Sequence, residues 1–167
     1  MIDGAYVARM ARYNRWQNEN LYGVADALSD DERRRERGAF FGSIHKTFSH
    51  LLWADTIQMS RFTSDVPKPA VGIPESVSLY PDWGALKDER ARFDRRIVDW
   101  ADKIDQAWLT GDVTYVSRAT GRELTRPRWV MVTHLFNHAT HHRGQVHCML
   151  TQAGGRPSAT DLPFMPE

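Results

Sequence analysis

The sequence contains a single cysteine, Cys148, among its 167 residues, and this scarcity narrows the chemistry open to the chain. One cysteine cannot form an intramolecular disulfide or build a cysteine-rich zinc module. A chain without disulfides is typical of a reducing compartment, so we expect a cytoplasmic protein. We expect Cys148 to be a small buried residue rather than a nucleophile.

Long apolar runs and an excess of one charge are also missing. No stretch approaches the roughly 20 apolar residues of a membrane-spanning helix, and residues 1–20 have no uninterrupted apolar core of a signal peptide. The 22 Lys and Arg residues are balanced by 21 Asp and Glu residues, whereas a nucleic-acid-binding surface needs excess positive charge. We therefore expect neither a membrane nor a nucleic acid as a partner.

Several motifs of well-known enzyme classes are absent. The sequence has no His-Glu-x-x-His zincin motif and no Glu-x-x-His pair of the kind that di-iron bundles use. It also has no glycine-rich phosphate loop and no Gly-x-Ser-x-Gly nucleophile motif. These absences exclude zincin, di-iron, P-loop and serine-hydrolase chemistry of the usual types.

The composition that remains is that of an ordinary globular protein. Hydrophobic residues make up 41% and charged residues 26%, which lets a chain of this length bury a substantial core, so we expect residues 1–167 to form one domain. Apolar residues recur at steps of three and four, which predicts long amphipathic helices. These helices are predicted at residues 3–28, 43–62, 83–107 and 127–153.

The polar residues within these helices carry their own predictions. Asn14 and Asn18 interrupt the apolar stripe of the first helix, and we interpret them as hydrogen-bonded amides at a helix seam, the alternative being a place near a ligand pocket. In the third helix, arginines such as Arg90 alternate with acids such as Asp94, which predicts an exposed face with ion pairs.

Two connections stand out. Residues 63–81 hold four of the eight prolines, which predicts a long crossover loop. Residues 113–124, with Gly121 near the turn, predict a small hairpin before the last helix. The proline-rich residues after Gly155 are expected to lie extended over the bundle. The expected fold is all-α: an antiparallel four-helix bundle with a long crossover loop and a small hairpin excursion.

Histidine is concentrated in the last predicted helix, which holds five of the seven in the chain. Residues four apart on a helix stack on one face, so two imidazoles there can point at one metal ion. Neutral imidazole is a ligand of zinc, nickel, copper and iron. The spacing leaves three pairs open: His134 with His138, His138 with His142, or His138 with His141.

A third ligand would have to come from another helix. His50 lies on an apolar face of the second helix, whereas His45, five residues away, is turned by about 140° and cannot face the same ion. Three protein nitrogens would leave an open coordination position, as in catalytic zinc sites. The alternatives are a packed core histidine at His50 and a solvent-exposed run of histidines that holds no metal.

Three segments, YNRWQN at 13–18, SIHKTFSHLLWAD at 43–55 and NHATHHRGQ at 137–145, resemble the DinB/YfiT-like family of metal-dependent enzymes. The order of the segments and the total length also match, so the resemblance covers essentially the whole chain. It implies a four-helix bundle that binds a divalent metal ion, nickel or zinc, through three histidines. Matched residue by residue, these ligands are His50, His138 and His142. The family is often dimeric, so a homodimer is expected.

The resemblance also suggests an activity. Related enzymes are transferases and isomerases that use low-molecular-weight thiols, so we expect a small-molecule electrophilic substrate and a thiol cosubstrate. Two alternatives use the same ligands: a metal-dependent hydrolase that activates a metal-bound water, and a non-enzymatic, metal-binding stress-response dimer. No motif identifies the substrate.

The neighbours of the ligands are given secondary roles. His134 is expected beside the site or in its pocket, and His141 on the outer face of the helix. Gln145 is expected to hydrogen-bond near the site or across the bundle. Arg143 is expected to form an ion pair at the surface or at a dimer interface, the alternative being that it steers an anionic thiol or substrate. Asp55 stands where relatives often have glutamate, so no role is transferred to it.

Overall fold

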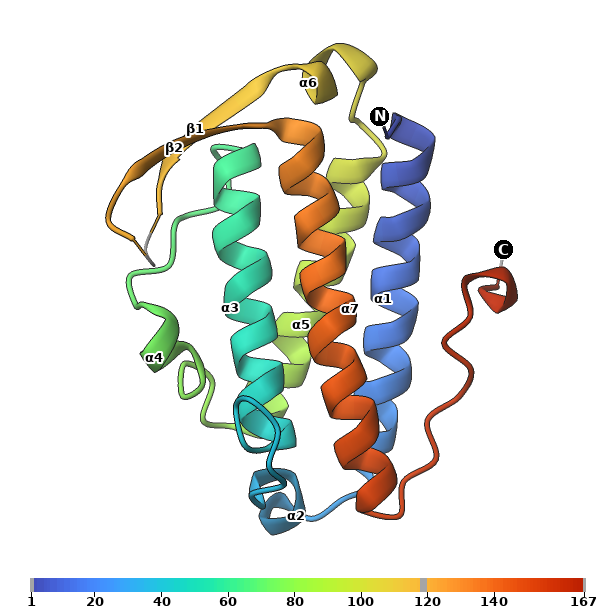
Figure 1. The fold of residues 1–167 in the computed structure, drawn as a ribbon. Helices are drawn as coiled ribbons and strands as arrows, with labels where there is room; N and C mark the ends of the chain where they lie inside the picture. The colour runs from blue at the N-terminus through green and yellow to red at the C-terminus, as the bar shows by residue number, and fades with distance from the viewer. Residues whose placement is uncertain (1, 118–119, 167) are drawn as a thin grey trace.

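Four long helices form the body of the protein, and this confirms the predicted all-α bundle (Figure 1). The computed structural model describes residues 2–117 and 120–166. The long helices are α1 (Gly4–Asp26), α3 (Ile44–Phe62), α5 (Trp83–Ala101) and α7 (Arg128–Gln152). Among the described residues, no helix is both long and apolar enough to cross a membrane.

N-cap side chains determine where the first three long helices begin. Asp3, Ser43 and Asp82 each accept a hydrogen bond from the backbone N–H three residues later, which satisfies a donor that the first turn leaves unpaired. The last helix follows Pro127 directly and ends before Gly154, whose φ of +83° suits a residue without a side chain. The sequence signals therefore predicted these ends within a few residues.

The crossover decides the direction of the helices. Helix α1 packs against α5 and α7, and α3 packs against the same two helices. Phe62 stacks on Trp100 where α3 and α5 both end, and His45 lies near Trp83 where both begin. The two helices are therefore parallel, which requires the long connection between them. The neighbouring pairs α1–α5 and α3–α7 run antiparallel (Figure 1).

Short helices occupy two places where the sequence predicted something else. The predicted crossover loop contains α4 (Ile73–Ser76), which packs beside α3. The third long helix ends at Ala101 instead of continuing to residue 107, and α6 (Gln106–Thr110) follows it. The reason is local: Asp105 accepts a hydrogen bond from the backbone N–H of Trp108 and so starts a new helix. Another short helix, α2 (Asp30–Arg34), lies between α1 and α3.

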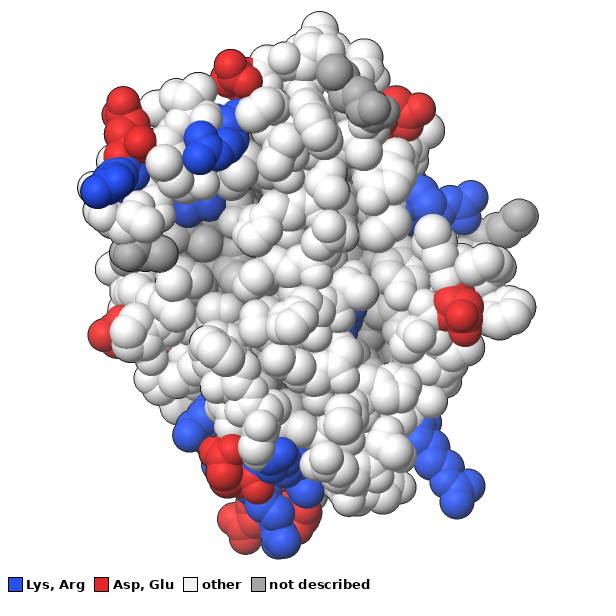
Figure 2. Space-filling model, viewed as in Figure 1, with Lys and Arg blue, Asp and Glu red and all other residues white. Residues whose placement is uncertain are grey.

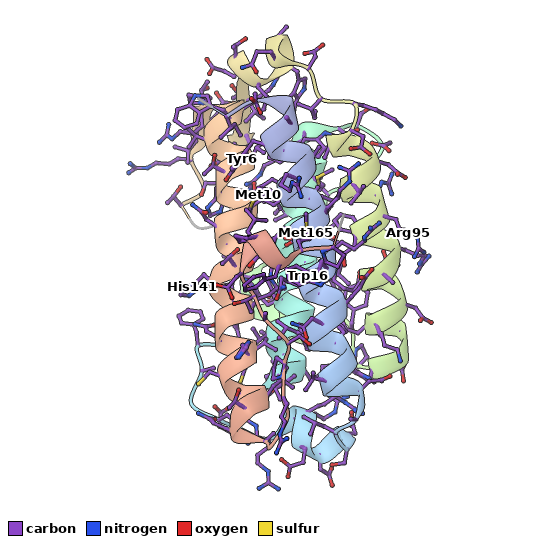
Figure 3. All side chains as sticks on the ribbon, turned by 90° about the vertical axis from the view of Figure 1, so that its right-hand side faces the viewer. Tyr6, Met10, Trp16, Arg95, His141 and Met165 are labelled. Atoms are coloured by element: carbon purple, nitrogen blue, oxygen red, sulfur yellow. The ribbon has the colours of Figure 1, made fainter. Side chains whose placement is uncertain are left out.

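The predicted hairpin and tail are both present. Strands β1 (Asp112–Val116) and β2 (Glu123–Pro127) pair antiparallel, and Gly121 has a φ of +66° in the connection. After α7 the chain runs back along α1, where the Ser158 N–H donates to Asn20 and the Tyr13 hydroxyl donates to the Thr160 carbonyl. Figure 3 shows this tail, with Met165 near its end, lying over α1.

A network of buried polar side chains runs through the bundle and joins all four long helices. Arg90 of α5 pairs with Asp55 of α3 and with Asp94 of its own helix, each at 2.7 Å. Asn18 of α1 donates to Asp94 at 2.9 Å. The network reaches α7 because Arg143 donates to Asn14, which in turn donates to Asp94 at 3.4 Å.

This network corrects two predictions and confirms a third. Arg90 and Asp94 were predicted on an exposed face, and Arg143 in a surface or interface ion pair, but all three are at least 95% buried. The interpretation of Asn14 and Asn18 as hydrogen-bonded amides at a helix seam is confirmed. Two arginines and two aspartates share the network, so their formal charges cancel, which is what burial of charged groups requires.

Candidate metal centre

Three histidines from two helices converge beside the core. His50 comes from α3, and His138 and His142 come from successive turns of α7, the helix antiparallel to it. One ring nitrogen from each lies within 4.8 Å of the other two. The ring centroids are 4.5 Å apart for His138 and His142, and 5.1 Å apart for His50 and His142. The geometry could hold one metal ion between the three rings.

A serine from the short helix α4 determines which nitrogen of His50 is free. The Nδ1 atom of His50 lies 2.8 Å from Ser76 Oγ, and that hydroxyl is 2.6 Å from the Ile73 carbonyl, to which it donates its only proton. The hydroxyl must therefore accept the second hydrogen bond, so Nδ1 carries the imidazole proton. The lone pair is then on Nε2, the nitrogen left for a metal ion.

Gln145, on the next turn of α7, likewise determines which nitrogen of His142 is free. Its Oε1 lies 2.8 Å from His142 Nδ1, and its amide Nε2 donates to Nε2 of His141 at 3.2 Å. Because an amide oxygen only accepts, His142 carries its proton on Nδ1 and its lone pair on Nε2. The predicted role of Gln145 near the site is confirmed, and it acts as an orienting group for the ring.

The environment keeps the three rings neutral. Burial, together with the neighbouring histidines, lowers the pKa of His50 to about 4 and that of His138 to about 3. Burial also lowers the pKa of His142. Phe41 covers the rings, with its centroid 3.9 Å from that of His50. Neutral imidazoles hold free lone pairs at pH 7, so the donor set suits a divalent ion that prefers nitrogen.

One side of the cluster opens into a cavity of about 410 Å³, a volume suited to a small organic molecule. His50 and His138 line it, whereas His142 is not part of its wall. Its other walls come from the C-terminal half of α3, the first turns of α7, the short helix α4 and the hairpin. Those residues are Trp53, Ala54, Ile57, Gln58, Arg61, Ile73, Tyr115, Ser117, Arg126, Val130, Met131 and His134.

The remaining sequence candidates lie outside the cluster. His134 is exposed and lines the cavity, with its ring centroid 5.6 Å from that of His138, as expected for a pocket residue. His141 is exposed on the outer face of α7, also as expected (Figure 3). His45 is buried elsewhere, with Nε2 2.7 Å from the Tyr80 carbonyl. Cys148 is exposed, so its prediction as a buried residue is wrong.

One residue at the site was missed in the sequence, and one further residue of α3 was left without a role. Ser76 lies between Pro74 and Pro81 of the crossover, and nothing in its sequence context distinguishes it from the other serines there. Asp55, to which no role was transferred, is buried on α3 five residues after His50 and pairs with Arg90 of α5 rather than with a histidine. The contact of Ser76 with His50 follows from the packing of α4 against α3. The burial of Asp55 and its ion pair with Arg90 follow from the packing of α5 against α3.

Together, the bundle with its crossover and the three-histidine cluster define a class of helical proteins with a candidate metal site between antiparallel helices. The sequence profile of the DinB family matches residues 1–167, so the chain belongs to the DinB family. It is 22% identical over 161 residues to Protein DinB of Bacillus subtilis (strain 168), an alignment that covers 96% of this chain and 92% of that protein.

A solved structure supports the same fold. The crystal structure of a DinB-like protein from Bacillus cereus ATCC 10987 superimposes with a TM-score of 0.59, covering 86% of this chain and 90% of that one at 18% sequence identity. At this identity the likeness concerns the fold alone. The assignment of His50, His138 and His142 as metal ligands stays a prediction.

Proposed function

We propose that this protein is an enzyme that depends on a divalent metal ion, nickel or zinc, held by His50, His138 and His142. The observation that carries the proposal is the convergence of three neutral imidazoles beside a cavity that two of them line. A structural metal site is usually closed by four protein ligands, whereas three ligands beside a cavity leave a position for substrate.

The reaction we propose is the transfer of a low-molecular-weight thiol to a small electrophile, or an isomerisation that uses such a thiol. This choice rests on the resemblance to thiol-dependent transferases and isomerases. When bound, the metal ion would supply Lewis acidity that lowers the pKa of a thiol. In the transfer, sulfur forms a bond to the electrophilic carbon, the thiol proton passes to solvent, and the leaving group departs with its electron pair.

The chain's own residues contribute orientation and exclusion of water. Ser76 and Gln145 hold two of the three rings by their Nδ1–H groups, so these rings are oriented before a ligand arrives. Trp53 and Ile57 give the cavity an apolar wall next to His50, which suits the carbon skeleton of a small substrate.

The first test is the metal content of the untagged protein, measured by elemental analysis. We expect about one nickel or zinc ion per chain in the wild type and none in the His138→Ala variant. His45→Ala is the matched control, because it removes a buried histidine outside the cluster and should keep the metal. A wild-type protein that takes up no metal even after reconstitution with nickel and zinc would refute the proposal.

The second test distinguishes the three possible functions: thiol transferase, hydrolase and non-enzymatic metal-binding protein. The metal-loaded protein is incubated with electrophiles, such as an activated aryl chloride, in the presence and absence of glutathione or cysteine. Turnover that requires the thiol supports the transferase. Turnover of activated esters without any thiol supports the hydrolase, and a stable metal complex without turnover of either kind supports the non-enzymatic alternative.

A further inference from the structure

The described charged side chains that line the cavity beside the histidines are all positive. Arg61 enters it from α3, and Arg126 enters it from β2 of the hairpin. In the part of the chain that the structure describes, no Asp or Glu lines the cavity. The chain as a whole carries nearly equal numbers of acids and bases, so this asymmetry is not a consequence of overall composition.

Arg61 is held in a definite place by its neighbours. Its guanidinium lies 4.0 Å from the ring centroid of Tyr115, in strand β1, and its Nη1 donates to the Gln58 side chain at 2.9 Å. The N–H groups of a guanidinium lie in its plane, so a guanidinium stacked on an aromatic ring presents them along its edge, the geometry that binds a carboxylate or sulfonate.

The rest of the cavity wall is largely apolar. Trp53, Ile57, Val130 and Met131 line it between the histidines and the arginines. A ligand that reaches from the histidines to Arg61 must therefore place a carbon skeleton against these side chains. The cavity thus has three regions in sequence: imidazole nitrogens, an apolar wall, and cationic groups.

We propose that the substrate of this site is an amphipathic organic anion, whose carboxylate or sulfonate group is bound by Arg61 and Arg126 while its apolar body lies along Trp53 and Ile57. This proposal rests on the proposed function in taking the cavity as the substrate site. Arg61 and Arg126 are then specificity-determining residues, and Tyr115 positions Arg61. Because the two arginines come from α3 and from the hairpin, a bound anion would also tie the hairpin to the bundle.

The test compares two probes that differ in charge alone: 3-phenylpropane-1-sulfonate and its neutral methyl sulfone. A sulfonate is a weak metal ligand, so its affinity reports the arginines rather than the histidines. Binding is measured by calorimetry or ligand-observed NMR at low and high salt. We expect the wild type to bind the sulfonate at least about tenfold more tightly than the sulfone, and added salt to reduce that preference.

The variants show whether the two arginines cause the preference. Arg61→Gln and Arg126→Gln should each lose most of it, and Arg61→Lys, which keeps the charge, should retain part of it. Arg95→Gln is the matched control, because Arg95 projects outward from α5, an element that contributes nothing to the described cavity wall (Figure 3). Thermal melting of each variant checks that the hairpin and bundle remain folded.

Two outcomes would overturn the proposal: equal binding of both probes by the wild type, or an unchanged preference in the two glutamine variants. The measurements are repeated on protein stripped of metal with EDTA. A charge preference that persists without metal, in a protein that never takes up nickel or zinc, would refute the proposed enzyme but keep the anion site. Metal binding without a charge preference would refute the anion site but keep the proposed enzyme.

Discussion

At the scale of single residues, the most informative contact is the one between Ser76 and His50. The serine hydroxyl gives its proton to the Ile73 carbonyl and therefore has only an acceptor to offer to the imidazole. An arrangement of this kind fixes the ring and its tautomer before a metal ion binds, and loss of such a partner commonly weakens metal affinity by about 10–100-fold.

We therefore expect Ser76→Ala to lower the affinity for nickel or zinc by about 10–100-fold while the protein stays folded. Competition with a chromophoric chelator measures the affinity, and circular dichroism checks the fold. Ser78→Ala is the matched control, since Ser78 is an exposed serine in the same segment whose hydroxyl donates to the Glu75 carbonyl. Equal affinities of the two variants would show that the hydroxyl of Ser76 does not orient His50.

A second residue-scale prediction concerns His45 and pH. This side chain is 2% exposed, its Nε2 bonds to the Tyr80 carbonyl, and its Nδ1 has no partner within the described residues. Burial lowers its pKa below the ordinary value of about 6.5. The unfolded chain then binds more protons than the folded one just below pH 6.5, so stability falls as the pH falls through this value.

His45→Gln should remove this contribution, because an amide can still donate to Tyr80 but does not titrate. We expect the free energy of unfolding of the metal-free wild type to fall more steeply with acidification below pH 6.5 than that of the variant, by at most about 1.4 kcal/mol per pH unit. Urea unfolding between pH 8 and pH 5 measures both slopes. Parallel curves would contradict the assignment of a buried neutral imidazole.

At the scale of elements, the buried polar network holds the helices in register. Arg90 bridges α5 to α3 through Asp55, and the asparagines of α1 connect α5 to Arg143 of α7. The same register brings His50 of α3 opposite His138 and His142, so the network and the candidate metal centre depend on one arrangement of helices.

Arg90→Met tests the network. The substitution leaves Asp55 and Asp94 without their cation in the interior, and removal of one partner from a buried ion pair typically costs about 3–5 kcal/mol. We expect a loss of that order in the free energy of unfolding, measured with urea on metal-free protein. Arg95→Met, an exposed change on the same helix, should stay within about 0.5 kcal/mol of the wild type. A similar small loss for Arg90→Met would show that the network contributes little.

At the scale of the whole molecule, one face of the protein is poor in charged side chains. In Figure 2 the face over α3 and α7 shows few charged side chains, and these gather at its margins. Helix α7 has Arg128 and Arg143 as its only charged residues, and Arg143 is buried. A row of exposed uncharged residues therefore follows one side of this helix, at Asn137, His141, Gly144 and Cys148. Interfaces between subunits are poor in charged residues.

We predict that light scattering will give twice the mass of one chain, and that Cys148→Glu will shift the protein toward the monomer, because two carboxylates would be brought together or buried at the interface. Arg95→Glu, an exposed change on α5, is the control and should not alter the mass. A wild-type mass equal to one chain at micromolar concentrations would contradict the expected dimer.

The sequence by itself determined what local interactions control. Periodic apolar residues and capping side chains predicted the four long helices, and prolines and Gly121 predicted the crossover and the hairpin, because these signals act within a few residues of chain. The histidine spacing predicted a face of the last helix. It could not choose among three possible pairs, and only the family resemblance pointed to His138 and His142.

The tertiary structure decided everything that depends on which element faces which. The rotation of α7 against α3 brings His138 and His142 to His50 and leaves His134 in the cavity wall. The packing of α4 brings Ser76 to the site, and the packing of α5 buries Arg90 and Asp94, whose sequence pattern matches an exposed helix face. A pattern of charges along one helix does not reveal whether another helix covers it, because burial is a property of the assembled bundle.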